Sequence, residues 1–268
     1  NSNIYYTGVV TVPIRMGNPE LKWQRVLKNN FGINLTLFKE RLGMSFDYFR
    51  NTTKDQLMTI PLPASTGSED IVVNFGENQN VGYDFSVAGQ VIRNKNWAWT
   101  SVINGSHVKD RIKQISDKLK NTAYQLEEDN PLKLRFREGG SQYDIYAVRS
   151  AGIDPATGQE IFINKNGEYT FKYDAEDEVV VGNTQPKLQG TWLNTLRYKG
   201  WSLNFVFSYT FGGDTYNKTL WEKVEDIDPR YNVDERAFTD RWKNPGDLSR
   251  YLAIKERRST TPHNSERF

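Results

Sequence analysis

The chain of 268 residues carries 35 basic and 33 acidic side chains, which gives a net charge of +2, and it contains no cysteine. This balance argues against a nucleic-acid partner, and the lack of cysteine excludes disulfide scaffolds, thiol nucleophiles and cysteine metal sites. With 13% aromatic and 37% hydrophobic residues, the sequence is too apolar for a disordered chain. The sequence contains no run of about 18 apolar residues, so no membrane helix is expected. The mean hydropathy of −0.70 is nevertheless compatible with membrane strands, which are apolar only at alternate positions.

Residues 29–57 contain the first strong pattern, in which apolar and small polar residues alternate as they do on the two faces of a strand. A four-residue turn at 38–41 would place Leu37 opposite Leu42, and the antiparallel register then follows. The pairs on one face are all apolar: Leu37/Leu42, Leu35/Met44, Ile33/Phe46 and Phe31/Tyr48. The pairs on the other face are small or polar: Thr36/Gly43, Asn34/Ser45 and Gly32/Asp47. The sequence therefore predicts a long hairpin with one apolar face.

Two further hairpins follow the same rule. In the second, Tyr83, Phe85 and Val87 alternate toward a turn near 93–96, and the alternation resumes at Trp97, Trp99, Ser101 and Ile103. In the third, a two-residue turn at Lys199 and Gly200 gives the pairs Tyr198/Trp201, Leu196/Leu203, Asn194/Phe205 and Trp192/Phe207. These hairpins supply six strands, and weaker patterns near 5–12 and 250–255 suggest one or two more.

The connections between these hairpins are long, roughly 49–82, 108–188 and 212–250, and all lie at the end opposite the short turns. Outer-membrane barrels have short periplasmic turns and long extracellular loops. Trp201 to Phe211 spans ten steps of ~3.3 Å, or about 23 Å of height at a tilt near 45°, which matches the apolar band of an outer-membrane barrel. We therefore expect an all-β fold, an antiparallel transmembrane β-barrel with its short turns in the periplasm.

This interpretation predicts which residues meet the bilayer, because amphipathic aromatic rings prefer the two interfaces and aliphatic side chains the apolar band. The expected lipid-facing residues are Ile33, Leu35, Leu37, Met44, Phe46, Phe85, Val87, Leu196, Leu203, Phe205 and Phe207. The expected aromatic girdle residues are Tyr48, Trp97, Trp99, Tyr198, Trp201 and Tyr209.

One alternative is a soluble or cell-surface β-sandwich that binds carbohydrate, because the inner face of a sandwich strand also alternates. Sandwich strands are usually shorter than these and joined by shorter loops.

Six strands are too few to close a barrel with loops of this size. We therefore expect residues 1–268 to form a partial barrel domain.

Chemistry-bearing residues are sparse. His107 and His263 lie far apart without acidic neighbours at ligand spacing, so no metal site, cofactor or enzyme activity is expected. The acidic stretch at 174–178 suggests either a calcium loop or, in better agreement with its spacing, a solvated loop. Residues 110–130 fit a partner-binding helix, a short loop helix or a strand extended above the membrane. Tyr143, Tyr146 and Trp221 are loop residues of a type that contacts substrates, and the sequence offers no basis for choosing among them.

Several segments in a fixed order carry a family resemblance. They are NPELKW (18–23), RLGMSFDYFRNTTKDQLMTIPLPASTG (41–67), GYDFSV (82–87), GIDPATGQ (152–159), GNTQPKLQGTWLNTLRYKGWSLNFVFSYTFGG (182–213) and DRWKNPGD (240–247). Together they resemble the C-terminal barrel half of SusC-like (SusC/RagA family) TonB-dependent outer-membrane transporters.

The resemblance implies a 22-strand barrel in the bacterial outer membrane that imports nutrients, typically glycans or peptides. It implies energy from the inner-membrane TonB–ExbB–ExbD complex, a SusD-like surface lipoprotein that acts as a lid, and a dimer of transporter–lipoprotein pairs. It also implies that the small polar strand face lines a lumen around a plug. The plug domain and the last strands are expected to lie outside residues 1–268.

Overall fold

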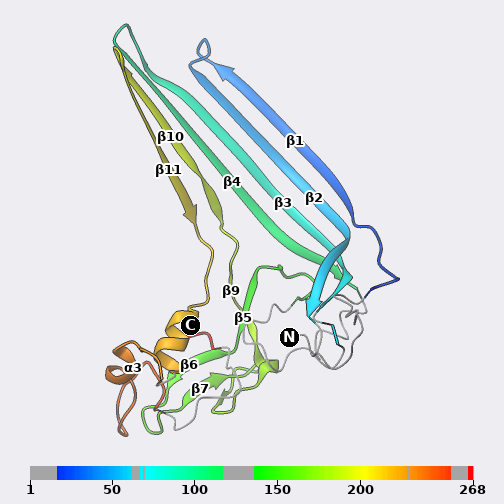
Figure 1. Cartoon of the computed structure of the whole chain (residues 1–268), viewed down its shortest axis with the longest axis vertical. Helices are drawn as coiled ribbons and strands as arrows, with labels where there is room; N and C mark the ends of the chain where they lie inside the picture. Colours follow the sequence, from blue (N-terminus) through cyan, green and yellow to red (C-terminus); the bar gives the residue numbers. More distant parts are fainter. Residues whose placement is uncertain are drawn as a thin grey trace, which may run out of the picture.

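The computed structural model describes residues 17–61, 67–68, 70–116, 136–227, 230–254 and 265–267. Its main feature is a tall six-stranded antiparallel sheet in the order β1–β2–β3–β4–β10–β11 (Figure 1). The strands are β1 (Arg25–Leu37), β2 (Leu42–Pro61), β3 (Asp70–Arg93), β4 (Trp97–Ile115), β10 (Leu188–Tyr198) and β11 (Trp201–Phe211). Neighbouring strands run antiparallel throughout, so the six predicted strands form one surface.

The predicted registers of the first and third hairpins are confirmed, and the second predicted hairpin also forms, with a register shift between Gln90 and Ile92. Leu37 pairs with Leu42 across a turn at 38–41, where the Arg41 amide donates to the Phe38 carbonyl at 3.3 Å. Tyr198 pairs with Trp201 across the two-residue turn, where Lys199 adopts a φ of 49°. The turn between β3 and β4 lies at 94–96 and is held by a hydrogen bond from the Asn94 amide to the Trp97 carbonyl.

The predicted loop at 49–82 is wrong over most of its length, because β2 continues to Pro61 and β3 begins at Asp70. The ladder passes through a bulge near Asp55, with a φ of 52°, and Gly76, with a φ of 140°. Above the bulge, Phe75, Ile112 and Ile115 form a small buried cluster, against which Met58, Ile60, Val73 and Phe136 pack. This cluster stabilises the parts of β2, β3 and β4 that extend past the regular alternation of apolar and polar residues.

The remaining elements form a module at the end of the sheet opposite the short turns (Figure 1). It contains β5 (Asp144–Ala147) paired with β9 (Val179–Asn183), and a three-stranded sheet of β6 (Arg149–Ile153), β7 (Glu160–Ile163) and β8 (Tyr169–Thr170). The short helices are η2 (Ala175–Asp177), α2 (Lys218–Leu220), η3 (Trp221–Glu225) and α3 (Arg236–Thr239). The module confirms that the long connections gather at one end.

Two weaker strand predictions have different outcomes. The pattern near 250–255 gives no strand in the described part of that range, where Tyr251 makes one isolated bridge to Arg241. The pattern near 5–12 lies outside the described residues. Within 110–130, residues up to Ile115 continue β4, as expected for a strand extended above the membrane, and 117–135 lie outside the described residues.

Candidate functional site

The six-stranded sheet has two faces of opposite character, and the register shows how each is built. Paired residues of adjacent antiparallel strands point to the same face. One such row crosses all six strands as Leu35–Met44–Val87–Ile103–Trp192–Phe207. We call this side the apolar face. All of the predicted lipid-facing and girdle residues lie on it.

The apolar face is extensively exposed, which is unusual for large hydrophobic side chains over so many strands. Trp201 is 81% exposed and Leu203 61% exposed. On the same face near the opposite edge of the sheet, Phe31, Leu35 and Phe46 are also exposed. Within the described residues, no helix is long and apolar enough to cross a bilayer.

Aromatic residues lie at both ends of the apolar face, as the sequence predicts. At the short-turn end, Trp97, Tyr198 and Trp201 form one row, and the Trp97 and Tyr198 ring centroids are 4.3 Å apart. At the other end, Tyr48 and Tyr83 are paired neighbours, and Tyr83 lies next to His107 with ring centroids 5.1 Å apart. His107 is a strand residue whose Nδ1 donates to the Lys187 carbonyl at 2.5 Å.

The opposite face, which we call the polar face, carries mainly small and hydrophilic residues, although one row nearer the short turns reads Thr36–Gly43–Ala88–Val102–Leu193–Val206 and is largely apolar. One row reads Asn34–Ser45–Ser86–Asn104–Thr191–Ser208, and the next reads Gly32–Asp47–Asp84–Ser106–Gln189–Thr210. A shallow groove of about 570 Å³ follows these rows over β2, β3, β4, β10 and β11. The polar face is therefore suited to a hydrated lumen.

A second groove of about 520 Å³ lies where the polar face meets the module. Strand residues line one part of this groove and module residues line the other part. The residues are Phe49, Asn51, Asn80, Ser106, Val108 and Gln189 on the strands, and Tyr143, Thr184, Gln185 and Pro186 in the module. Because the two grooves share Ser106 and Gln189, they adjoin and form a polar path along this face.

Of the three loop aromatics that the sequence singles out, the structure brings one to this groove. Tyr143 is 45% exposed and lines it. Tyr146 is only 2% exposed and packs beneath the Arg137 guanidinium, 5.1 Å from the ring centroid, so it is a structural residue. Trp221 begins η3 and is not among the lining residues of either groove.

Sequence reasoning missed Asn51, Asn80 and Val108 as groove residues because it treated their positions as loop. Alternation does continue through them, since Phe49 and Asn51 occupy the same parity in β2 as Asp47. That parity is the signal that could have found them.

Asp110 connects β4 to the module beside this groove and is only 4% exposed. Its Oδ1 accepts hydrogen bonds from Ser141 Oγ at 2.9 Å and the Gln142 amide at 2.7 Å. Its Oδ2 accepts from Asn78 Nδ2 at 2.5 Å. A buried carboxylate therefore holds the segment that leads directly to Tyr143.

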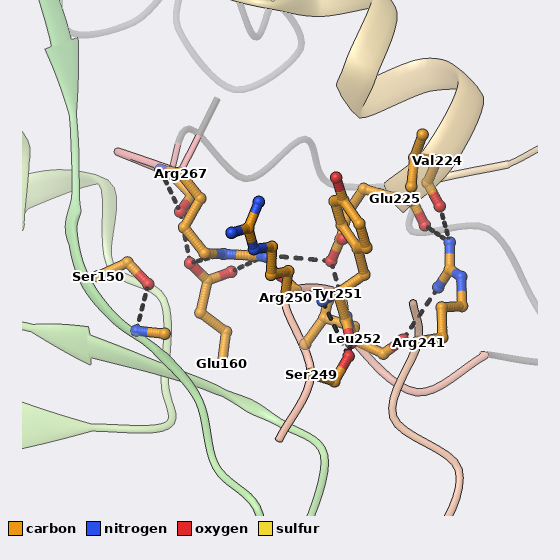
Figure 2. Close-up of polar contacts among 12 residues, drawn as sticks. Ser150, Glu160, Val224, Glu225, Arg241, Ser249, Arg250, Tyr251, Leu252 and Arg267 are labelled. Atoms are coloured by element: carbon orange, nitrogen blue, oxygen red, sulfur yellow. Dashed lines mark hydrogen bonds and ion pairs between the residues drawn. The ribbon is translucent and has the colours of Figure 1, made fainter. Parts of the chain in front are cut away.

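A second buried polar cluster holds the module together, as Figure 2 shows. Arg267 donates to Glu160 Oε1 at 2.8 Å and to Glu225 Oε1 at 3.0 Å, and so joins β7 to η3. Burial acts to raise the pKa of Glu160, but the hydrogen bonds and charge of Arg267 and the Ser265 hydroxyl lower it below its ordinary value. Burial raises the pKa of the nearby Tyr216 to about 12. This cluster anchors residues 265–267 on the module.

The stretch at 174–178 adopts a short local turn. Asp174 caps η2 by accepting a hydrogen bond from the Glu176 amide, and Asp177 accepts one from the Lys165 amide at 3.0 Å. Within the described residues, no group of three or more His, Cys, Asp or Glu side chains is arranged to hold a metal ion.

Comparison with known families identifies this architecture. Residues 1–251 match the family described as TonB dependent receptor-like, beta-barrel. The chain belongs to this family. The β-sandwich alternative is therefore wrong, since the sorted faces belong to a barrel wall rather than to one of two packed sheets.

Individual relatives agree with the family. The TonB-dependent receptor P39 of Formosa agariphila is 27% identical over 97% of this chain and 29% of its own length. The TonB-dependent receptor SusC of Bacteroides thetaiotaomicron is 22% identical over 76% of this chain and 21% of its own length. Of the solved structures, one described as the RagAB peptide transporter has a TM-score of 0.76 at 24% identity, covering 96% of this chain and 29% of that chain. The chain thus spans under a third of these proteins and has the fold of part of a SusC-like barrel.

Proposed function

We propose that this chain is part of the wall of a TonB-dependent outer-membrane importer. The observation that carries the proposal is the sorting of side chains across all six strands. One register leaves one face mainly apolar and the other mainly polar across all six strands. A bilayer on one side and a hydrated lumen on the other account for both faces at once.

In this arrangement the apolar face contacts lipid, its two aromatic ends lie at the membrane interfaces, and the short turns face the periplasm. The module then lies outside the cell. The rest of the barrel, the plug and the contact with TonB–ExbB–ExbD come from polypeptide beyond these residues.

The polar path supports a proposal for the cargo class. Its lining consists mainly of hydroxyl and amide side chains together with Asp47, Asp84 and Tyr143, and it suits hydrogen-bonding cargo such as oligosaccharides or peptides. Because the second groove lies where the polar face meets the module, we propose that the SusD-like lipoprotein lies over the module and closes the extracellular mouth. A dimer of such transporter–lipoprotein pairs is part of the same proposal.

The test uses matched arginine substitutions on the two faces of the full-length protein. Leu35 and Phe205 lie in the two central rows of the apolar face, and Asn34 and Asn204 lie beside them on the polar face. We expect Leu35→Arg and Phe205→Arg to cost about 2 to 4 kcal/mol each and to impair assembly. Asn34→Arg and Asn204→Arg should assemble normally.

Assembly is measured by the amount of heat-modifiable protein in the outer-membrane fraction. Equal tolerance of all four substitutions would refute the assignment of the apolar face to lipid. Loss of assembly only with Asn34→Arg and Asn204→Arg would reverse the two faces.

A further inference from the structure

Basic side chains gather on the apolar face just beyond its last aromatic row, at the end of the sheet nearer the module. That aromatic row is Phe31–Tyr48–Tyr83–His107. The next row on the same face pairs Arg50 with Val81 and Val81 with Lys109. One further step along β4 brings Arg111, paired with Gln79. We call Arg50, Lys109 and Arg111 the cationic row.

The positive charges of the cationic row are not neutralised within the described part of the chain. All three side chains are exposed, and the ion pairs of that part join other residues, such as Lys54 to Glu77. Asp110 separates Lys109 from Arg111 in sequence, but it points to the other face and bonds to the module.

Arg50 is also held in position by an uncharged group. In the amide orientation that satisfies both side chains, Gln79 Oε1 accepts hydrogen bonds from Arg50 Nε at 2.8 Å and Nη2 at 3.0 Å. Such contacts orient the guanidinium and leave its charge available to a ligand.

The height of the row corresponds to the lipid head groups. Arg50 and Lys109 lie two residues beyond the aromatic row, which is ~6.7 Å along the strand or about 5 Å along the membrane normal at a tilt near 45°, and Arg111 lies about 5 Å further out. Aromatic rings of a girdle lie at the head-group boundary, so the cationic row lies just outside it, at the level of head-group phosphates. Arg50 and Lys109 are two strands apart, about 10 Å between backbones, which is within the combined reach of their side chains.

We propose that the cationic row binds the phosphate-bearing head group of an outer-leaflet lipid, of the lipid A type. The guanidinium groups of Arg50 and Arg111 suit bidentate contact with phosphate oxygens, and Lys109 adds a mobile charge. The Tyr83 side chain in the row below borders the acyl chains. This inference rests on the proposed function, which places the apolar face in lipid.

The test measures lipid binding by the full-length protein, extracted from outer membranes in mild detergent and transferred to lipid nanodiscs. The probes are phosphorylated lipid A, the same lipid A after enzymatic dephosphorylation, and inorganic phosphate as a competitor. The variant R50Q/K109Q/R111Q removes the cationic row. The matched control K39Q/K95Q/K199Q removes three exposed charges from the short turns at the other end of the sheet.

We expect each lost charge to weaken binding of phosphorylated lipid A about fivefold, and all three on the order of a hundredfold. The control should bind within about twofold of wild type, and dephosphorylated lipid A should bind the wild type as weakly as phosphorylated lipid A binds the triple variant. K109Q alone should weaken binding about fivefold, and it serves if the triple variant folds poorly. Arg111→Lys, which keeps the charge, should retain most of the affinity.

Several results would overturn the inference. These are unchanged binding in R50Q/K109Q/R111Q, an equal loss in the control, or full displacement of the lipid by millimolar inorganic phosphate, which would identify a free-phosphate site. Recovery of the wild type outside the outer-membrane fraction would instead refute the proposed function and this inference with it. A wild type that lies in the outer membrane but does not distinguish the two forms of lipid A refutes this inference alone.

Discussion

Replacing Asp110 by alanine should release the segment that carries Tyr143 while leaving the sheet intact. The Asp110 carboxylate accepts hydrogen bonds from Asn78, Ser141 and the Gln142 amide. A buried donor without its acceptor costs about 1 to 3 kcal/mol, and contributions from one network do not add fully. We therefore expect the docking of the module segment to weaken by on the order of 3 to 5 kcal/mol.

Hydrogen exchange can follow this change at a single amide. The Gly139 amide donates to the Ile112 carbonyl at 2.8 Å, so it is protected only while the segment is docked on β4. A loss of 3 to 5 kcal/mol corresponds to about two to four orders of magnitude in the protection factor. Asp174→Ala, which removes an exposed cap in η2, is the control and should leave Gly139 unchanged.

Unchanged protection at Gly139 in the Asp110→Ala variant would refute the role of this carboxylate. Loss of protection throughout the central strands would refute it in another way, because it would show that Asp110 supports the whole sheet rather than one contact. The first result would show that the position of Tyr143 in the groove does not depend on the hydrogen bonds of Asp110.

Two further predictions concern other parts of the chain. Because the pKa of Glu160 is lowered in the folded state, its contribution to stability is complete above the ordinary value of 4.5 and is lost as pH falls through the lower folded value. The protection factor of the Glu266 amide, which donates to the Val148 carbonyl, should fall as pH decreases below 4.5, after correction for the intrinsic exchange rate, and Glu160→Gln should abolish this pH dependence. Gly190→Ala should reduce heat-modifiable protein, since a Cβ there would lie 2.6 Å from the Tyr209 hydroxyl, whereas Gly89→Ala, with open space around it, should not. Normal assembly of Gly190→Ala, or a pH-independent protection factor at Glu266 in the wild type, would contradict these arguments.

The registers of the hairpins could be predicted because two constraints act on every pair. Shifting one strand by a single residue would move Leu35 and Met44 to opposite faces, so the turn and both faces agree on only one alignment. The requirement that paired residues share one face no longer fixes the register in the part of the sheet nearer the module. There the bulge at Asp55 and Gly76 changes the register, and no alternation in the sequence marks the point where it does so.

The module could not be predicted in the same way, because its strands have only two to five residues and its contacts join distant positions. Arg267 and Glu160 form an ion pair although more than a hundred residues separate them in the sequence, and no local pattern predicts such a pair. The groove beside Tyr143 depends on this packing. Its strand residues follow from parity, but its cover follows only from the fold.

Polar residues on the apolar face show how a barrel wall tolerates exceptions to its own pattern. Asn194 lies on the apolar face yet is fully buried; Trp99 Nε1 donates to its Oδ1 at 3.0 Å, while its Nδ2 has no hydrogen-bond partner within the described residues. Trp192 Nε1 likewise donates to Ser101 Oγ at 2.8 Å. Each indole N–H thereby gains a hydrogen-bond partner, which the hydrocarbon core of a bilayer could not supply. If the apolar face meets lipid as proposed, Asn194 and Ser101 are compatible with that face because each accepts a hydrogen bond from a tryptophan of the same face.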